Sequence, residues 1–172
     1  MNTGQTMLAM GAMMLLSFLV LRFNSIHLTA AQASYNSKFG IVATSLATSL
    51  LEEAKDNMFD EIVLDTTKVI SSAAELSTVL GPEGAEVYPD FDDFDDYNNL
   101  YHVDSLSLKN PQTGAPTNFE IWAKVEYVSD GNPDVKSSIN TYHKKMTVSV
   151  FSSAMIDTVK LSTVFSYWHL LE

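Results

Sequence analysis

A run of closely spaced aspartates is the part of this sequence that most directly suggests chemistry. Residues 88–99 read YPDFDDFDDYNN. Carboxylates this close repel one another unless solvent or a cation lies between them, and their hard oxygen atoms suit Ca²⁺. The glycine and the final glutamate of an EF-hand loop are missing, which excludes that module. The segment therefore predicts either a solvated acidic loop or a calcium site with Asp90, Asp92, Asp93, Asp95 and Asp96 as candidate ligands.

Motifs typical of enzymes are not found elsewhere in the sequence. The chain has no Gly-rich phosphate loop, no G-x-S-x-G elbow and no H-E-x-x-H pair. Its four histidines, His27, His102, His143 and His169, show no ligand spacing, and cysteine is absent, which excludes disulfides and thiolate sites. The net charge of −11 argues against nucleic acid as a partner, because nucleic-acid binding needs a basic face. We therefore expect no catalytic residues and no cofactor other than the possible calcium ion.

The part of the chain that precedes the acidic run begins with an apolar N-terminal segment. No charged residue lies between Gln5 and Leu21, and Arg22 follows. Three interpretations of this segment are open. It is a secretory signal peptide with an A-x-A-like cleavage site at residues 31–33, a single-span membrane anchor, or the first half of a much longer helix.

The residues after Arg22 favour the longer helix. Residues 24–63 contain no proline and one glycine, Gly40. Apolar residues recur there at helical spacing, which predicts one buried face: Tyr35, Phe39, Val42, Leu46, Leu50, Ala54, Met58 and Ile62. The opposite face is polar: Lys38, Ser45, Ser49, Glu52, Glu53, Asp56 and Asp60. A helix from about Gln5 to Ile62 is roughly 85 Å long, more than a domain of this size covers.

The pattern changes to a period of two in the C-terminal half. A capping box at Ser72–Glu75 predicts a short helix that ends at the turn over 81–84. Alternation then predicts strands at about 101–108, 118–128, 144–153 and 158–168, with turns at 110–114 and 130–133. The expected fold is α+β. A long N-terminal α-helix, apolar in its first half and amphipathic in its second, packs on a C-terminal antiparallel β-sheet of about four strands.

This division gives two regions. Residues 1–33 form the apolar helix, which is a filament core or a membrane segment. Residues 34–172 form a globular domain with a helix continuation at 34–63, a connecting region at 64–100 and a sheet at 101–170.

The arrangement resembles a type IV pilin or pseudopilin. A short leader ends in a glycine, the sequence QTML opens the apolar helix, and an amphipathic continuation and a β-rich half follow. A run similar to DDFDDYN precedes the sheet in some pilin-like proteins. The resemblance implies that a prepilin peptidase cuts between Gly4 and Gln5 and that the new N-terminus is methylated. The position that usually carries glutamate in this family is Ala9, so the chain departs from the family there.

The resemblance implies a structural subunit of an extracellular pilus or fimbrium on the bacterial cell surface. The chain is expected in the inner membrane before the pilus machinery assembles it into a helical homopolymer with roles such as adhesion. The expected filament-core residues are Met7, Leu8, Met10, Met14, Leu15, Phe18, Leu19 and Leu21. The alternative is a membrane-anchored or secreted single-domain binding protein, with a secretion-system pseudopilin or minor pilin between the two.

Overall fold

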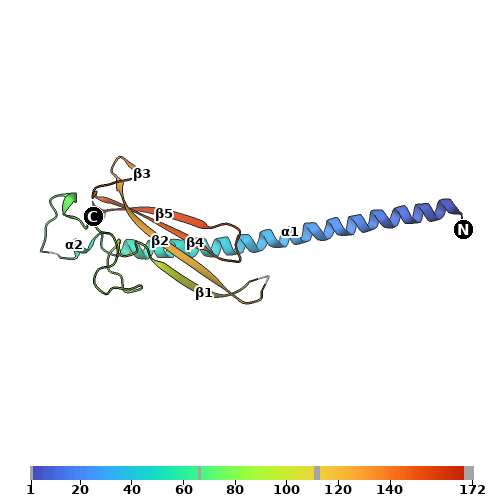
Figure 1. The fold of residues 1–172 in the computed structure, drawn as a ribbon, viewed down its shortest axis with the longest axis horizontal. Helices are drawn as coiled ribbons and strands as arrows, with labels where there is room; N and C mark the ends of the chain where they lie inside the picture. Colours follow the sequence, from blue (N-terminus) through green and yellow to red (C-terminus); the bar gives the residue numbers. More distant parts are fainter. Residues whose placement is uncertain (1, 66, 111–112, 169–172) are drawn as a thin grey trace. The chain divides into compact units, whose positions relative to one another are not determined.

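The structure is a computed structural model that describes residues 2–65, 67–110 and 113–168. Several predicted features lie outside these residues: Met1 of the leader, residues 111–112 of the first turn, His169 and the last residues of the predicted sheet region. The chain divides into two compact units, residues 1–38 and 39–172. One helix, α1 (Thr3–Asp56), contributes to both units (Figure 1).

In the second unit, α1 packs on the sheet through a face that is shifted around the helix from the one that the large apolar residues predict. The buried residues of α1 are Phe39, Ala43, Ala47, Leu50, Leu51 and Ala54. Val42 and Leu46 pack at the margin of this core, and Met58 is 40% exposed. Alanine occupies the fully buried positions of this face at residues 43, 47 and 54, where no large side chain is present.

The predicted continuation of the helix to residue 62 is wrong, because α1 ends at Asp56. The backbone of Met58 bonds instead to the acidic run: its N–H donates to the carbonyl of Asp92 at 3.2 Å, and its carbonyl accepts from Phe94 N–H at 2.8 Å. A separate short helix, α2 (Glu61–Leu64), then begins with the Asp60 carboxylate accepting from the Ile62 N–H at its N-terminus. Asp60 was expected on the polar face but is fully buried, because helical periodicity does not continue through this break.

The antiparallel sheet contains the four predicted strands in the order β1–β2–β4–β5. Their bounds are β1 (Tyr101–Lys109), β2 (Pro116–Ser129), β4 (His143–Phe151) and β5 (Val159–Ser166). A fifth strand, β3 (Asn132–Lys136), pairs with the end of β2 where only a turn was predicted. The α+β prediction is confirmed.

The inward face of the sheet follows the predicted alternation. In β2 the side chains of Phe119, Ile121, Ala123, Val125 and Tyr127 are all buried. In β4 the buried side chains include Met146, Val148 and Val150, and Ile121 lies opposite Val150 in the register of the two strands. Together with the buried face of α1 they form one core.

The connecting region has less helix than predicted. The capping box forms only the 3-10 turn η1 (Ala73–Glu75), in which the Ser72 hydroxyl accepts from the Ala74 N–H. Leu76 ends this turn and is buried against the core, so the chain leaves the helical path early. Gly84 takes a left-handed conformation with a φ of 62°, which suits glycine and helps to form the turn that carries Glu83 and Glu86.

Candidate functional site

The first candidate site is the apolar surface of α1 in the first unit. Every predicted filament-core residue is helical and exposed, with exposed fractions between 59% and 77%: Met7, Leu8, Met10, Met14, Leu15, Phe18, Leu19 and Leu21. Thr3–Asp56 is the helix whose length and composition are sufficient to cross a bilayer among the described residues. Exposing an apolar surface of this extent to water is energetically unfavourable.

Several hydroxyl side chains of α1 donate hydrogen bonds to the backbone of the helix itself. The Ser17 hydroxyl donates to the carbonyl of Met13 at 2.8 Å, and that of Thr29 to the carbonyl of Ser25 at 3.0 Å. These bonds satisfy the hydroxyl donors, which lowers the cost of placing them in an apolar medium. The first half of α1 is therefore chemically suited to lipid or to neighbouring apolar helices.

The expected processing residues lie in the first turns of α1. The Gln5 N–H donates to the Asn2 carbonyl at 2.9 Å. A Cβ on Gly4 would meet no atom of the described chain within 4 Å, so local packing does not require glycine there.

The second candidate site is the acidic run, and the structure separates its five aspartates. Asp90 and Asp92 are exposed, whereas Asp93, Asp95 and Asp96 are buried. The groups that could hold a metal, among the described residues, include only Asp93 and Asp96 of the five. The run is therefore neither a uniformly solvated loop nor a single five-aspartate cage.

Asp95 belongs to a buried ion-pair cluster around Lys144. The Lys144 ammonium donates to the Asp60 carboxylate at 2.8 Å, to the Phe59 carbonyl at 2.7 Å and to the Asp95 carboxylate. It also lies 4.5 Å from the centre of the Phe59 ring. An ammonium has three donors, so these bonds use its full capacity.

The Asp60 carboxylate also accepts hydrogen bonds from residues other than Lys144. It accepts from the Ser77 hydroxyl at 2.8 Å and from the Tyr127 hydroxyl at 3.2 Å. Burial raises the pKa of Asp60, but the charge and hydrogen bonds of Lys144 and Ser77 outweigh burial and hold that pKa below its ordinary value. Burial outweighs the same lysine at Asp95 and raises its pKa to about 6. Asp60 is therefore the better stabilised anion of the two.

Asp93 and Asp96 bind the loop backbone with one carboxylate oxygen each. Asp93 Oδ1 accepts from the N–H groups of Asp95 and Asp96, and Asp96 Oδ2 accepts from those of Asp92 and Asp93. Burial and the neighbouring charges of Asp95 and Asp96 raise the pKa of Asp93 to about 8. These bonds fix the backbone of the acidic run, but they involve only one of the two oxygen atoms of each carboxylate.

Three glutamates meet these two aspartates. Carboxylate oxygens of Glu61, Glu83 and Asp93 lie within 4.8 Å of one another, and so do those of Glu83, Glu86 and Asp96. Burial, followed by the charges of Asp93, Asp96 and the other two glutamates, raises the pKa of Glu83 to about 7. We call these five residues the carboxylate cluster.

The sequence prediction missed Lys144 and the three glutamates. For Lys144 a signal existed, because the alternation through Met146, Val148 and Val150 places residue 144 on the same inward face. For Glu61, Glu83 and Glu86 no local signal existed, because the fold brings them to the aspartates from separate segments.

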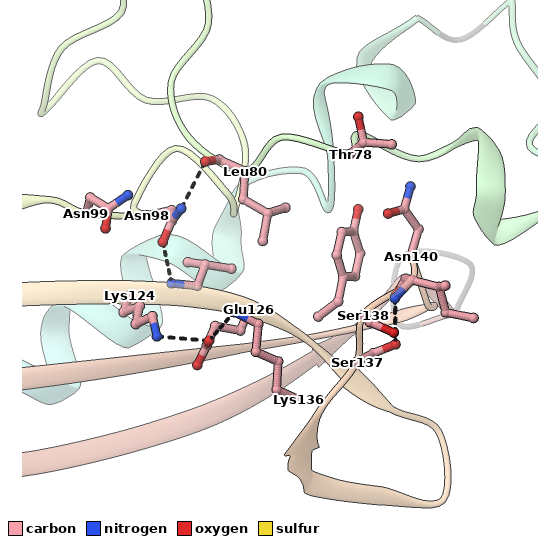
Figure 2. A pocket seen from close by; sticks show the side chains of 13 residues that line it. Thr78, Leu80, Asn98, Asn99, Lys124, Glu126, Lys136, Ser137, Ser138 and Asn140 are labelled. Atoms are coloured by element: carbon pink, nitrogen blue, oxygen red, sulfur yellow. Dashed lines mark hydrogen bonds and ion pairs between the residues drawn. The ribbon is translucent and has the colours of Figure 1, made fainter.

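An open pocket lies beside the end of β2, and Figure 2 shows its polar lining. Lys124 and Lys136 both pair with Glu126, at 2.9 and 2.8 Å. Asn98 bonds the Leu80 carbonyl and the Val125 N–H, which ties the connecting region to the sheet. Because these polar side chains already bond other groups of the chain, we interpret the lining of this pocket as a structural feature.

Comparison with protein-family models, with curated proteins and with solved structures finds no match to this chain. Function is therefore inferred from the chain's own residues.

Proposed function

We propose that this chain is the structural subunit of an extracellular, type IV pilus-like helical filament that polymerises through its apolar N-terminal helix. One observation carries the proposal: the first unit is helical and exposes large apolar side chains on all sides. These side chains extend from Met7 to Leu28, about the length of one membrane span of roughly 20 residues, and α1 then continues into the second unit as far as Asp56.

The free energy available from covering this surface is large. Burying one leucine, phenylalanine or methionine side chain contributes about 1.5–3 kcal/mol. The exposed apolar side chains continue beyond Leu21 through Phe23, Ile26 and Leu28. Packing many copies of this helix around one axis would remove all of these side chains from water.

The distribution of charge supports the same proposal. All 21 carboxylate side chains of the chain follow Leu51, so the apolar helix carries none. The acidic domain is suited to the outside of a filament, where it meets water and where its charge discourages unspecific association.

Processing at the Gly4–Gln5 bond is part of the proposal. Gly4 lies in the first turn of α1, and a Cβ there would meet no atom of the described residues within 4 Å, so packing does not require glycine at this position. Recognition by the peptidase would account for it. The implied partners are a prepilin peptidase, the assembly machinery, the inner membrane before assembly and further copies of the chain.

The second candidate is a membrane-anchored single-domain binding protein. The observation that favours it is that α1 also satisfies the requirements for a single membrane span. In that case the apolar helices of two chains do not contact one another. A secretion pseudopilin or a minor pilin shares features of both candidates.

The test is microscopy of material sheared from cells that produce the full chain, with N-terminal sequencing of its subunit. The proposal predicts fibres that contain this chain, with Gln5 as the first residue. Deletion of Met7–Leu21 is expected to abolish the fibres. Cells that produce the intact chain only as a membrane-bound monomer, without fibres, would contradict the proposal and favour the anchor.

A further inference from the structure

The carboxylate cluster joins three segments that precede the sheet. Glu61 lies in α2, Glu83 and Glu86 lie on the turn formed with Gly84, and Asp93 and Asp96 lie in the acidic run. Glu83 belongs to both triads of converging oxygens. Every member is in the second unit of the chain.

Buried oxygen atoms of this cluster have no hydrogen-bond partner among the described residues. Asp93 is 0% exposed and Asp96 is 1% exposed. Asp93 Oδ2 and Asp96 Oδ1 are buried and unpartnered, and so are an oxygen of Glu61 and an oxygen of Glu83. Since the other oxygens of Asp93 and Asp96 bind loop N–H groups, the unpartnered oxygens are those left to bind a ligand.

The charge of the cluster is not balanced by the protein. The ion pairs among the described residues include none of the five carboxylates. Lys144 is the nearby buried cation, and its three donors bond Phe59, Asp60 and Asp95. Burying unpaired carboxylates is costly, and a bound cation removes the cost.

The donor atoms indicate which cation fits. Ca²⁺ binds six to eight oxygen atoms at about 2.4 Å in a flexible geometry, and carboxylates are among its usual ligands. Mg²⁺ requires a tighter octahedron at about 2.1 Å and keeps several waters, so it suits a site built from several protein carboxylates less well. Nitrogen and sulfur ligands, which favour zinc, are not in the cluster.

We propose that the carboxylate cluster binds Ca²⁺ through its two triads of converging oxygens, with Glu83 as the ligand that the triads share. The ion joins α2, the turn at Gly84 and the acidic run in front of the sheet. This site does not depend on polymerisation, because all its ligands come from the folded unit of one chain.

The first experiment is a calcium titration of the full chain in a non-ionic detergent, in which calorimetry measures the heat of binding. The second measures thermal unfolding of the same chain in Ca²⁺ and in EDTA. The wild-type chain is expected to bind with a Kd of about 0.1–1 mM, as in extracellular calcium modules, and to unfold at a higher temperature in Ca²⁺ than in EDTA. Glu83→Gln is expected to weaken binding at least about tenfold. Asp96→Asn is a second ligand variant, whose amide oxygen can still accept the loop N–H groups.

Asp90→Asn is the matched control, since it removes one charge from an exposed position of the same acidic run and should bind calcium like the wild type. A change in fold is distinguished by the measurements in EDTA. There the Glu83→Gln chain should be at least as stable as the wild type, because a repulsive charge is removed, whereas in Ca²⁺ it should be less stable.

Three results would overturn the proposal. One is a wild-type chain with no binding heat and no shift in unfolding temperature at 10 mM Ca²⁺, a concentration about ten times the weakest expected Kd. Another is calcium binding by Glu83→Gln and Asp96→Asn that equals the wild type. The third is binding of Mg²⁺ as tight as that of Ca²⁺, which would contradict the choice of ion.

Discussion

The Lys144 ammonium donates to the Asp60 carboxylate at 2.8 Å, and both side chains are fully buried. The two residues are 84 positions apart in the chain. Their pair connects the segment between α1 and α2 to strand β4, and Asp95 of the acidic run joins it. The end of the long helix, the acidic run and the sheet are therefore held together by one cation.

Replacing Lys144 with methionine removes that cation and leaves two buried carboxylates without it. The free energy of unfolding is expected to fall by about 3–5 kcal/mol, since breaking a buried ion pair leaves an uncompensated charge. Chemical denaturation of the full chain in non-ionic detergent measures this. Lys145→Met is the control, because Lys145 pairs with the exposed Asp134 and should contribute less than about 1 kcal/mol. Equal losses in the two variants would show that the buried pair has no special role.

Replacing Ala47 with leucine tests the packing of α1 in the core of the second unit. Ala47 is 0% exposed, so the added atoms must displace the helix or its neighbours. The expected loss is about 1–3 kcal/mol in the free energy of unfolding, the usual effect of overpacking. Ser45→Leu adds a similar volume at an exposed position of the same helix and should change stability by less than about 0.5 kcal/mol. A tolerated leucine at 47 would mean that the interface is looser than described.

Asn98→Ala removes the side chain that bonds the Leu80 carbonyl (Figure 2) and the Val125 N–H. Losing both bonds is expected to cost about 1–3 kcal/mol, and amide hydrogen exchange should accelerate at Val125. Asn99→Gly is the matched control. Asn99 is exposed and has a φ of 64°, a conformation that glycine adopts without strain, so this variant should retain the wild-type stability. Unchanged exchange at Val125 in Asn98→Ala would argue against the role of the Asn98 bonds.

Cysteine pairs in the apolar helix distinguish a polymer from an anchor, because the native chain has no cysteine. Residues 8 and 15 of one helix are about 10 Å apart, beyond the roughly 7 Å limit for a disulfide, so any cross-link between them joins two chains. Chains with Leu8→Cys paired with Leu15→Cys, Phe18→Cys or Leu19→Cys are expected to give ladders of covalent multimers in oxidised surface material.

The control for this prediction is the single variant Leu8→Cys, which cannot form covalent chains longer than dimers. Denaturing electrophoresis without reductant measures the ladder. A complete absence of multimers for every pair, in cells that display the protein, would contradict packing of these helices against one another.

The local patterns predicted much of the fold. Alternation predicted the inward residues of β2 and β4 because a strand places every second side chain on the same face, whatever the rest of the chain does. Apolar composition likewise predicted the first half of α1, because a helix of such residues satisfies its own backbone. On the amphipathic half, the burial of large side chains such as Val42 and Leu46 was overestimated, whereas the small Ala43 and Ala47 are fully buried.

Tertiary structure alone decided the end of the helix and the composition of the carboxylate cluster. Nothing in residues 57–60 excludes helix, but the backbone of Met58 bonds Asp92 and Phe94, which lie far along the chain. The same contacts bury Asp60 beside Lys144 and bring Glu61, Glu83 and Glu86 to Asp93 and Asp96. Sequence spacing predicted either a solvated acidic loop or a calcium site. Which carboxylates meet, and which are neutralised by a lysine, depends on contacts between distant segments that no local pattern encodes.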